Sequence, residues 1–365
     1  MRRTGATIAL AALLASVGLA ACGGDDDNGG GGGGGEAKQI ALLLPETKTA
    51  RYEAHDRPDF TAKVKELCPK CEVIYANAAQ DPTKQQAQAE AAITRGADML
   101  VLDAVDAESA TAIVDRAKQS NIPVLAYDRL ISNADIDYYV SFNNVRQGRI
   151  QGQSLLDGLG SDAKGSSIVM VNGSPTDPSA GDYKEGAHQV LDKSGVKIAK
   201  EYDTPDWSPD KAQREMDQAV TALGKGQIAG VYSANDGMAS GILAALKSAG
   251  IDPAKVPVTG GDAEVAALQR ILAGEQYSTI YLTIKKQAET SAEIAVAVAQ
   301  GKDVPAGLIN ARTDNGQEKV PSVLLTPIAV TKDNIADTVI KDGFYDPSEI
   351  CTGKYKSACD AAGIS

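Results

Sequence analysis

The chain has 365 residues, of which 43% are hydrophobic and 4% aromatic, and a formal net charge of −12 at pH 7. This length allows two domains, and the composition is typical of a water-soluble α/β protein. The acidic balance excludes a nucleic-acid-binding protein, because such a protein needs a basic surface to neutralise phosphates.

The first 21 residues have the pattern of an export signal. The basic start, MRR, precedes the apolar run ATIALAALLASVGLAA, which is short for a membrane span. The run leads to Cys22 in LAAC, which resembles the lipobox of bacterial lipoproteins, whose cysteine carries the lipid. An ordinary signal peptide with an incidental cysteine is the alternative. Residues 22–38 are rich in glycine and aspartate and are expected to form a flexible tether. We therefore expect an exported protein, lipid-anchored to the outer face of the cell membrane or in the periplasm.

From residue 39, short apolar runs alternate with amphipathic segments of helix length. The runs of the first half are expected to be strands buried on both faces, at 40–44, 73–76, 99–102, 123–127 and 138–142. The expected strands of the second half lie at 167–171, 198–202, 228–232, 256–260 and 277–281. This βαβ progression predicts an α/β fold of two lobes, each built on a doubly wound parallel sheet.

Besides Cys22, the chain has four cysteines, in LCPKCE and ICTGKYKSAC. An oxidising compartment favours disulfides, and four cysteines allow three pairings. We expect the local pairs, Cys68 with Cys71 and Cys351 with Cys359, because closing a short loop costs little entropy. A redox-active CPKC is one alternative, but this motif follows an expected helix and precedes a strand, the reverse of the thioredoxin arrangement. A four-cysteine zinc site is another, although the two pairs lie far apart and no histidine accompanies them. We expect no metal and no cofactor.

Polar or aromatic residues follow most of the expected strands. In open parallel sheets, ligands bind beyond the carboxyl ends of the strands. If the two lobes face each other, one cleft is lined by Lys48, Arg51, Tyr52, Asp128, Arg129, Asp177, Trp207, Asn235 and Asp262, with Asn172 and Asp236 beside them. Taken singly, each could be a surface ion pair, a cap or a turn residue, and Asp262 could cap the helix that follows it. The repetition at strand ends favours a binding cleft.

The residue types of this cleft suit a sugar. Sugar hydroxyls both donate and accept, so carboxylates, amides and guanidinium groups can hold them through directional bonds. The C–H face of a sugar packs on an aromatic ring, and Trp207 is the only tryptophan of the chain. These properties predict a site for a small polyhydroxylated ligand.

An enzyme is the competing class of protein. The sequence contains no GxSxG, P-loop or HExxH motif, and its two histidines, His55 and His188, accompany no cysteine or serine motif. A carbohydrate-active enzyme stays open as a remote alternative, because Asp128, Asp177 and Asp262 could form a catalytic carboxylate pair. A sugar-responsive repressor is rejected, because the chain begins with a signal and a tether where such a protein has a helix-turn-helix.

Several longer motifs carry a family resemblance. They include AYDRLISNADIDYYVSFNN, NGSPTD, SANDG, TGGDAEV, GEQYSTIY and VPSVLLTPIAVTKDNIADTVIKDGFY. From about residue 39 to about 345, the chain resembles the D-xylose-binding and multi-monosaccharide-binding proteins of bacterial sugar ABC transporters, within the type I periplasmic-binding family. The resemblance implies two lobes joined by three crossovers that close over one sugar. The implied lobe limits are 39–142 plus about 283–312, and 143–282 plus about 323–365.

The resemblance also implies roles for single residues. On one wall it implies contacts from Arg51 and from Tyr52, where the family usually has tryptophan. It assigns Asp128 and Arg129 to the ring hydroxyls. It makes Asp177 an acid after the GSP turn and Trp207 the stacking ring. The far wall is completed by Asn235 and Asp262. The role of Lys48, where some members have arginine or lysine, is the least defined.

Two departures from the family pattern bear on the ligand. Ser179 stands where the family commonly has an amide, and Leu282 stands where it commonly has a lysine, with Lys285 nearby. The segment from Cys351 to Cys359 lies outside the resemblance. The implied function is a monomeric receptor that delivers a monosaccharide, foremost D-xylose, to a membrane permease. The alternative is a broad-specificity receptor for glucose, galactose or arabinose in uptake or chemosensing.

Overall fold

The structure is a computed structural model that describes residues 37–364. The expected signal segment, Cys22 and nearly all of the expected tether lie outside the described residues. Residues 37–364 belong to one compact unit. Within residues 37–364, no helix is long and apolar enough to cross a membrane.

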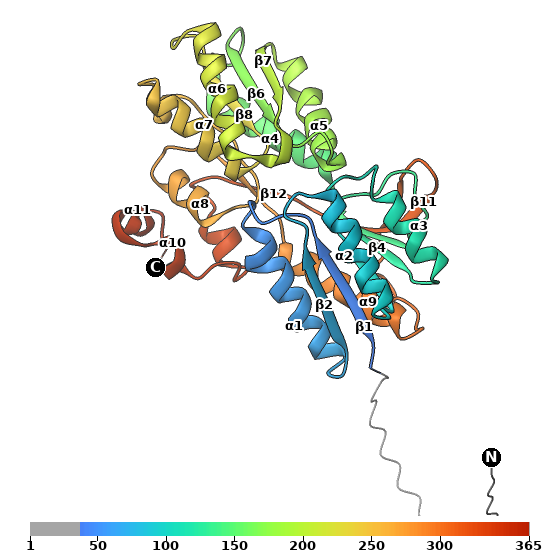
Figure 1. Cartoon of the computed structure of the whole chain (residues 1–365). Coiled ribbons are helices and arrows are strands. Elements are labelled where there is room, and N and C mark those ends of the chain that lie inside the picture. The colour runs from blue at the N-terminus through green and yellow to red at the C-terminus, as the bar shows by residue number, and fades with distance from the viewer. Residues whose placement is uncertain (1–36, 365) are drawn as a thin grey trace, which may run out of the picture. The chain divides into compact units, whose positions relative to one another are not determined.

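The first lobe, called here the N-terminal lobe, is built on a seven-stranded sheet (Figure 1). Its strands, in spatial order, are β10 (Ala311–Asp314), β11 (Lys319–Leu325), β5 (Tyr138–Phe142), β4 (Val124–Tyr127), β3 (Met99–Leu102), β1 (Gln39–Leu44) and β2 (Glu72–Asn77). All neighbouring strands are parallel except β10 and β11. The five strands expected in the first half of the sequence are therefore confirmed.

Helices cover both faces of this sheet because both faces are apolar. The helices are α1 (Arg57–Leu67), α2 (Pro82–Thr94), α3 (Thr111–Gln119) and α9 (Ile284–Ala299). Alternate residues of β1 show the arrangement: Ile40 and Leu42 belong to the core that contains α1 and α9, whereas Ala41 and Leu43 belong to the core that contains α2 and α3. Successive side chains of a strand point to opposite faces, so each face of β1 is packed.

The second lobe, the C-terminal lobe, has a smaller parallel sheet in the order β7-β6-β8. Its strands are β6 (Ser167–Asn172), β7 (Lys197–Asp203) and β8 (Gly230–Ser233). Its helices are α4 (Asn144–Leu159), α5 (Pro178–Ser194), α6 (Pro209–Leu223) and α7 (Asp236–Ser248). The next helix, α8 (Val265–Leu272), has Leu268, Ile271 and Leu272 in the apolar cluster that contains α1 and α9. A separate apolar core fills this lobe, which confirms the predicted two-lobe α/β class.

Of the strands expected in the second half, the one at 256–260 does not form and the one at 277–281 is shorter than predicted. Residues 256–260 make only one bridge, from Val258 to Val231 of β8. Pro257 has no N–H to donate to a ladder, and Gly260 ends the segment, which limits the pairing. The last expected strand is reduced to β9 (Thr279–Tyr281), which pairs antiparallel with β12 (Ile328–Val330).

The chain passes between the lobes at three places, as predicted. It leaves the N-terminal sheet after β5 to enter α4, returns from β9 to α9, and leaves again from β11 to β12. Two of these crossovers lie side by side, since the Asn143 N–H donates to the Leu325 carbonyl at 2.9 Å.

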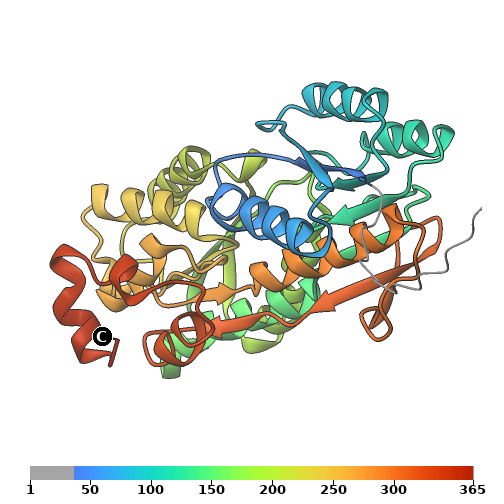
Figure 2. The same cartoon turned by 90° about the horizontal axis from the view of Figure 1, so that it is seen from below.

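Both expected local disulfides are present. Cys68–Cys71 joins the end of α1 to the start of β2, and Cys351–Cys359 closes the C-terminal segment. That segment contains α10 (Pro347–Ile350) and α11 (Lys356–Ala361), and α10 packs on α8, as Figure 2 shows for the red end of the chain. The CPKC motif follows a helix and precedes a strand, so its place differs from that of a thioredoxin motif.

Candidate functional site

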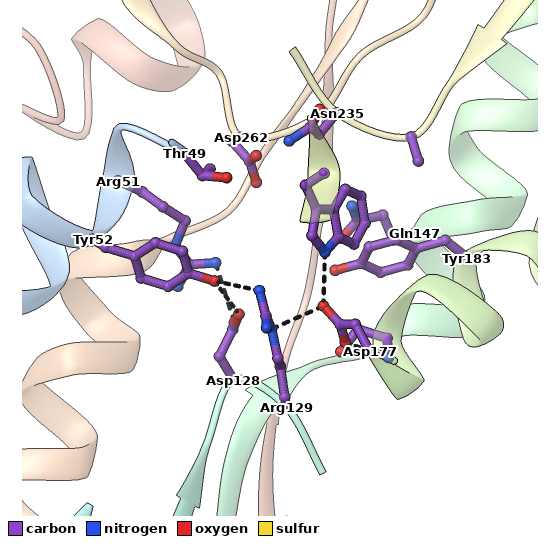
Figure 3. Close-up of a pocket in the computed structure, with 13 residues that line it drawn as sticks. Thr49, Arg51, Tyr52, Asp128, Arg129, Gln147, Asp177, Tyr183, Asn235 and Asp262 are labelled. Atoms are coloured by element: carbon purple, nitrogen blue, oxygen red, sulfur yellow. Dashed lines mark hydrogen bonds and ion pairs between the residues drawn. The ribbon is translucent and has the colours of Figure 1, made fainter. Parts of the chain in front are cut away.

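A pocket lies between the two lobes, and side chains from both lobes line it. Its lining residues are Thr49, Arg51, Tyr52, Asp128, Arg129, Gln147, Asp177, Ser179, Tyr183, Trp207, Ala234, Asn235 and Asp262 (Figure 3). Eight of the nine residues predicted to bind ligand are in this set. The ninth, Lys48, is exposed and does not line the pocket.

The N-terminal wall is organised around Arg51, which precedes the π-helical turn Tyr52–Asp56. The Arg51 guanidinium donates to Asp56 through Nε at 3.0 Å and Nη2 at 2.7 Å. Its Nη1 donates to Asp128 at 3.1 Å, and Nη2 also donates to Gln287 Oε1 at 2.7 Å. Gln287 Nε2 in turn donates to Asp128 at 3.0 Å. The four side chains form one closed network, so this wall is fixed without a ligand.

Asp128 and Arg129, which directly follow β4, both line the pocket. Asp128 has a φ of 63°, a left-handed conformation that costs a residue with a Cβ about 1–3 kcal/mol. Its carboxylate lies 3.5 Å from the Tyr52 hydroxyl. Arg129 donates from Nη2 to the same hydroxyl at 3.4 Å, and Figure 3 shows its guanidinium between Tyr52 and Asp177. The turn after β4 thus directs an acceptor and a donor toward the same space.

Asp177 is both a helix cap and a pocket residue. One carboxylate oxygen accepts from the Ser179 N–H at 2.9 Å and caps α5. The other accepts from Trp207 Nε1 at 3.1 Å and lies 2.9 Å from Arg129 Nε. This ion pair joins the two lobes across the pocket. Burial raises the pKa of Asp177, and the Arg129 charge opposes that shift.

Room for the Trp207 ring depends on a glycine of the GSP turn. A Cβ atom on Gly173 would lie 2.1 Å from the ring of Trp207. Tyr183 of α5 meets the same ring edge-on, with centroids 6.3 Å apart. Trp207 itself has a φ of 53°. The ring is therefore packed against the lobe by one face and held by its N–H, which leaves it suited to stacking.

Asn235 and Asp262 complete the C-terminal wall in different ways. Asn235 caps α7 by accepting from the Met238 N–H at 2.9 Å. Asp262 has a φ of 89° and does not cap the next helix, whose N-cap is Glu264. Within residues 37–364, no hydrogen bond or ion pair reaches the Asp262 carboxylate. Burial raises the pKa of this carboxyl well above its usual range, and the charge of Arg51 opposes the shift.

The sequence interpretation missed four side chains of the pocket: Thr49, Gln147, Tyr183 and Ala234. Gln147 is the most informative, because it is 1% exposed and its Oε1 has no hydrogen-bond partner within the described residues. It lies in the first turn of α4, where a polar residue looks like part of a solvated helix face. Ser179, which stands at the family's amide position, does line the pocket.

The two other residues noted as departures or neighbours lie elsewhere. Leu282 is 1% exposed, belongs to the apolar core and does not line the pocket. Lys285 is exposed on α9. Within residues 37–364, no cluster of three histidine, cysteine or acidic side chains could hold a metal ion. The pocket lining thus combines hydrogen-bonding side chains with three aromatic rings, those of Tyr52, Tyr183 and Trp207.

Comparisons with known proteins agree with this geometry. Residues 40–303 match the family described as "Periplasmic binding protein domain". The D-xylose-binding periplasmic protein of Escherichia coli (strain K12) is 38% identical over 316 residues, covering 86% of this chain and 92% of that protein. The multiple sugar-binding periplasmic receptor ChvE of Rhizobium radiobacter is 36% identical over 287 residues, covering 74% and 81%.

A solved structure extends the comparison to three dimensions. An ABC transporter solute binding protein from Clostridium phytofermentans, with bound beta-D-glucose, has a TM-score of 0.77 and 26% identity, covering 86% of this chain and all of that one. These relatives are named as binding proteins or receptors, which confirms the expectation that the chain is not an enzyme.

Proposed function

The chain belongs to the periplasmic binding protein family, and from this premise we propose that it is an extracytoplasmic receptor for a monosaccharide, foremost D-xylose. The observation that carries the proposal is the convergence of eight of the nine predicted ligand-binding residues on one pocket between the lobes. The 38% identity to a D-xylose-binding protein supports the choice of sugar.

In the proposed complex, each wall contributes a different kind of contact. Asp128 and Asp262 accept from sugar hydroxyls, while Asn235 and the guanidinium groups donate to them. Trp207 stacks on the C–H face of the ring. Gln147, whose amide oxygen lacks a partner in the described residues, adds one further acceptor. Because these groups come from both lobes, a sugar that contacts both favours closure of the cleft.

We further propose how the receptor is placed and used. Residues 1–21 are removed, Cys22 carries the lipid, and residues 22–38 tether the folded part to the membrane surface. The closed monomer then delivers its sugar to the permease of an ABC transporter. The lobe limits proposed for this movement are those given by the family resemblance.

A broad-specificity aldose receptor is the second candidate. The 36% identity to a multiple sugar-binding receptor favours it. Leu282, where the family commonly has a lysine, lies in the apolar core and does not line the pocket, so it does not distinguish the two candidates.

Calorimetric titration of the purified protein against xylose, glucose, galactose, arabinose and ribose tests both candidates. We expect at least one sugar to bind with a Kd of about 1 μM or tighter. Tighter binding of xylose by tenfold or more (about 1.4 kcal/mol) supports the xylose receptor, and similar constants for several aldoses support the broad one. If every Kd is weaker than about 1 mM, the receptor proposal fails.

A further inference from the structure

A buried carboxylate behind the pocket, that of Asp103, takes no part in the proposed sugar contacts. It follows β3, its side chain is fully buried, and neither carboxylate oxygen has a hydrogen-bond partner within residues 37–364. Its main chain is fixed, because Gln85 Nε2 donates to the Asp103 carbonyl at 2.7 Å and the Asp103 N–H donates to the Leu43 carbonyl at 3.0 Å. A buried carboxylate is costly unless a cation faces it, so the neighbouring cation defines its role.

That cation is Arg129, whose Nε lies 3.4 Å from Asp103 Oδ1. The same Nε lies 2.9 Å from Asp177 Oδ2, which belongs to the opposite lobe. The Arg129 Nε–H forms no hydrogen bond of good geometry with either carboxylate. Its charge therefore interacts with both Asp103 and Asp177. The rest of the guanidinium is held by the N-terminal lobe, through Nη1 to the Ala104 carbonyl at 3.0 Å and Nη2 to the Tyr52 hydroxyl at 3.4 Å. Separation of the lobes would therefore remove Asp177 from Arg129 and leave Asp103 in place.

We propose that Asp103 is a positioning residue that competes with Asp177 for Arg129 Nε and thereby weakens the contact that closes the empty cleft. The inference rests on the proposed function only in that opening admits the sugar. Asp103 offers Arg129 the same partner in the open and the closed state, so Arg129 does not become an unpaired charge when the cleft opens. Only a difference in interactions between two states shifts their equilibrium. That difference is the approach of Asp177, which meets an Arg129 Nε that already faces Asp103 and is itself repelled by the Asp103 carboxylate, so closure gains less.

The test is Asp103→Asn, which keeps the shape of the side chain and removes its charge. With Asp177 as the only carboxylate left on Nε, the ligand-free protein is expected to be more closed. Small-angle X-ray scattering should then give a smaller radius of gyration than for the wild-type protein. Sugar association, followed by the fluorescence of the single tryptophan, should slow about threefold to tenfold because a smaller open fraction is available.

Two further variants test the contact between the lobes and provide a control. Asp177→Asn removes the contact across the lobes and should increase the radius of gyration of the ligand-free protein. Asp106→Asn is the matched control, because Asp106 lies in the same loop, accepts from the Ser109 N–H at 2.7 Å and makes no ion pair with Arg129. It should leave both the scattering and the association rate unchanged.

The proposal is overturned if Asp103→Asn keeps the circular dichroism, the radius of gyration and the association rate of the wild-type protein, or if it opens the cleft. If Asp103→Asn does not fold, Asp177→Asn decides: an unchanged radius of gyration would show that its ion pair does not close the cleft. If no variant and no wild-type protein binds sugar, the proposed function fails, whereas the ligand-free scattering still tests Asp103.

Discussion

The two walls of the pocket differ in how their polar groups are satisfied. On the N-terminal wall, Arg51, Asp128 and Gln287 bond to one another. On the C-terminal wall, the buried Gln147 amide oxygen and the half-buried Asp262 carboxylate have no hydrogen-bond partner within residues 37–364. A polar group that is buried without a partner costs free energy. The N-terminal wall is therefore already formed without a ligand, whereas on the C-terminal wall a bound ligand supplies the missing hydrogen-bond partners.

Replacing Arg51 by alanine is the strongest test of the prebuilt wall. The change leaves the carboxylates of Asp56 and Asp128 without their shared counter-ion, and Asp56 is 1% exposed. Breaking such a buried pair from one side should lower the free energy of unfolding by about 3–5 kcal/mol. Denaturant unfolding of the wild-type protein and of Arg51→Ala measures this loss.

A matched arginine provides the control for this variant. Arg57 pairs with Glu53 at 3.1 Å, and both side chains are more than one third exposed. Arg57→Ala should cost less than about 1 kcal/mol. Equal losses for the two alanine variants would contradict the description of the N-terminal wall as a closed network.

The C-terminal wall is supported from behind by Asp236, which allows a test by pH. Its carboxylate accepts from Thr279 Oγ1 at 2.7 Å, Gln276 Nε2 at 2.8 Å and the Glu264 N–H at 3.0 Å. Burial raises the pKa of Asp236 to about 7, whereas an unfolded aspartate titrates near pH 4. The folded state therefore binds the proton more tightly, and this stabilisation is complete below about pH 4 and is lost as the pH rises through about 7.

The difference between the wild-type protein and Asp236→Asn should consequently change with pH. The wild-type free energy of unfolding is expected to fall by up to about 4 kcal/mol relative to the variant between pH 4 and 7. Denaturant unfolding at four or five pH values measures the two slopes. Parallel curves would mean that Asp236 titrates alike in the folded and the unfolded chain, and the account of its burial would be wrong.

Replacing Asp262 by asparagine probes the unsatisfied side of the comparison. If a sugar hydroxyl donates to this carboxylate, affinity should fall by about tenfold to a hundredfold, the value of a hydrogen bond to a charged group. Stability should not fall, because no protein group within residues 37–364 bonds to the carboxylate. Titration calorimetry and thermal unfolding are measured on the same sample. A lower melting temperature with unchanged affinity would make Asp262 a structural residue.

Single residues show which features of the fold and of the pocket could be predicted from the sequence. The strands of the N-terminal lobe were predictable because β1 and its neighbours are apolar on both faces. Asp128 was predictable because the end of a parallel strand is where a ligand meets the sheet. The burial of Gln147 and Asp103 was not predictable, because the sequence alone does not show whether a polar side chain is buried or exposed. Only the packing around it shows whether its partner is water, a neighbour or a ligand.

Lys48, the one predicted ligand-binding residue that does not line the pocket, is placed outside it by its own loop. Glu46 is fully buried and accepts from the main-chain N–H groups of Lys48 and Thr49. This fixes a turn in which Thr49 lines the pocket and Lys48 is exposed. The rule of strand ends identifies where such a loop begins, but it does not identify which of two successive side chains faces the cleft.

Lys48→Ala is therefore expected to have the smallest effect of the four substitutions. Sugar affinity should change less than about twofold and the free energy of unfolding by less than about 0.5 kcal/mol, as for other exposed positions away from special contacts. Thr49→Ala is the control in the adjacent position, and it should weaken binding more than Lys48→Ala because its side chain lines the pocket. A tenfold loss of sugar affinity in Lys48→Ala (about 1.4 kcal/mol) would mean that this loop changes conformation when the ligand binds, so that Lys48 faces the pocket. The N-terminal wall would then not be fully formed before binding.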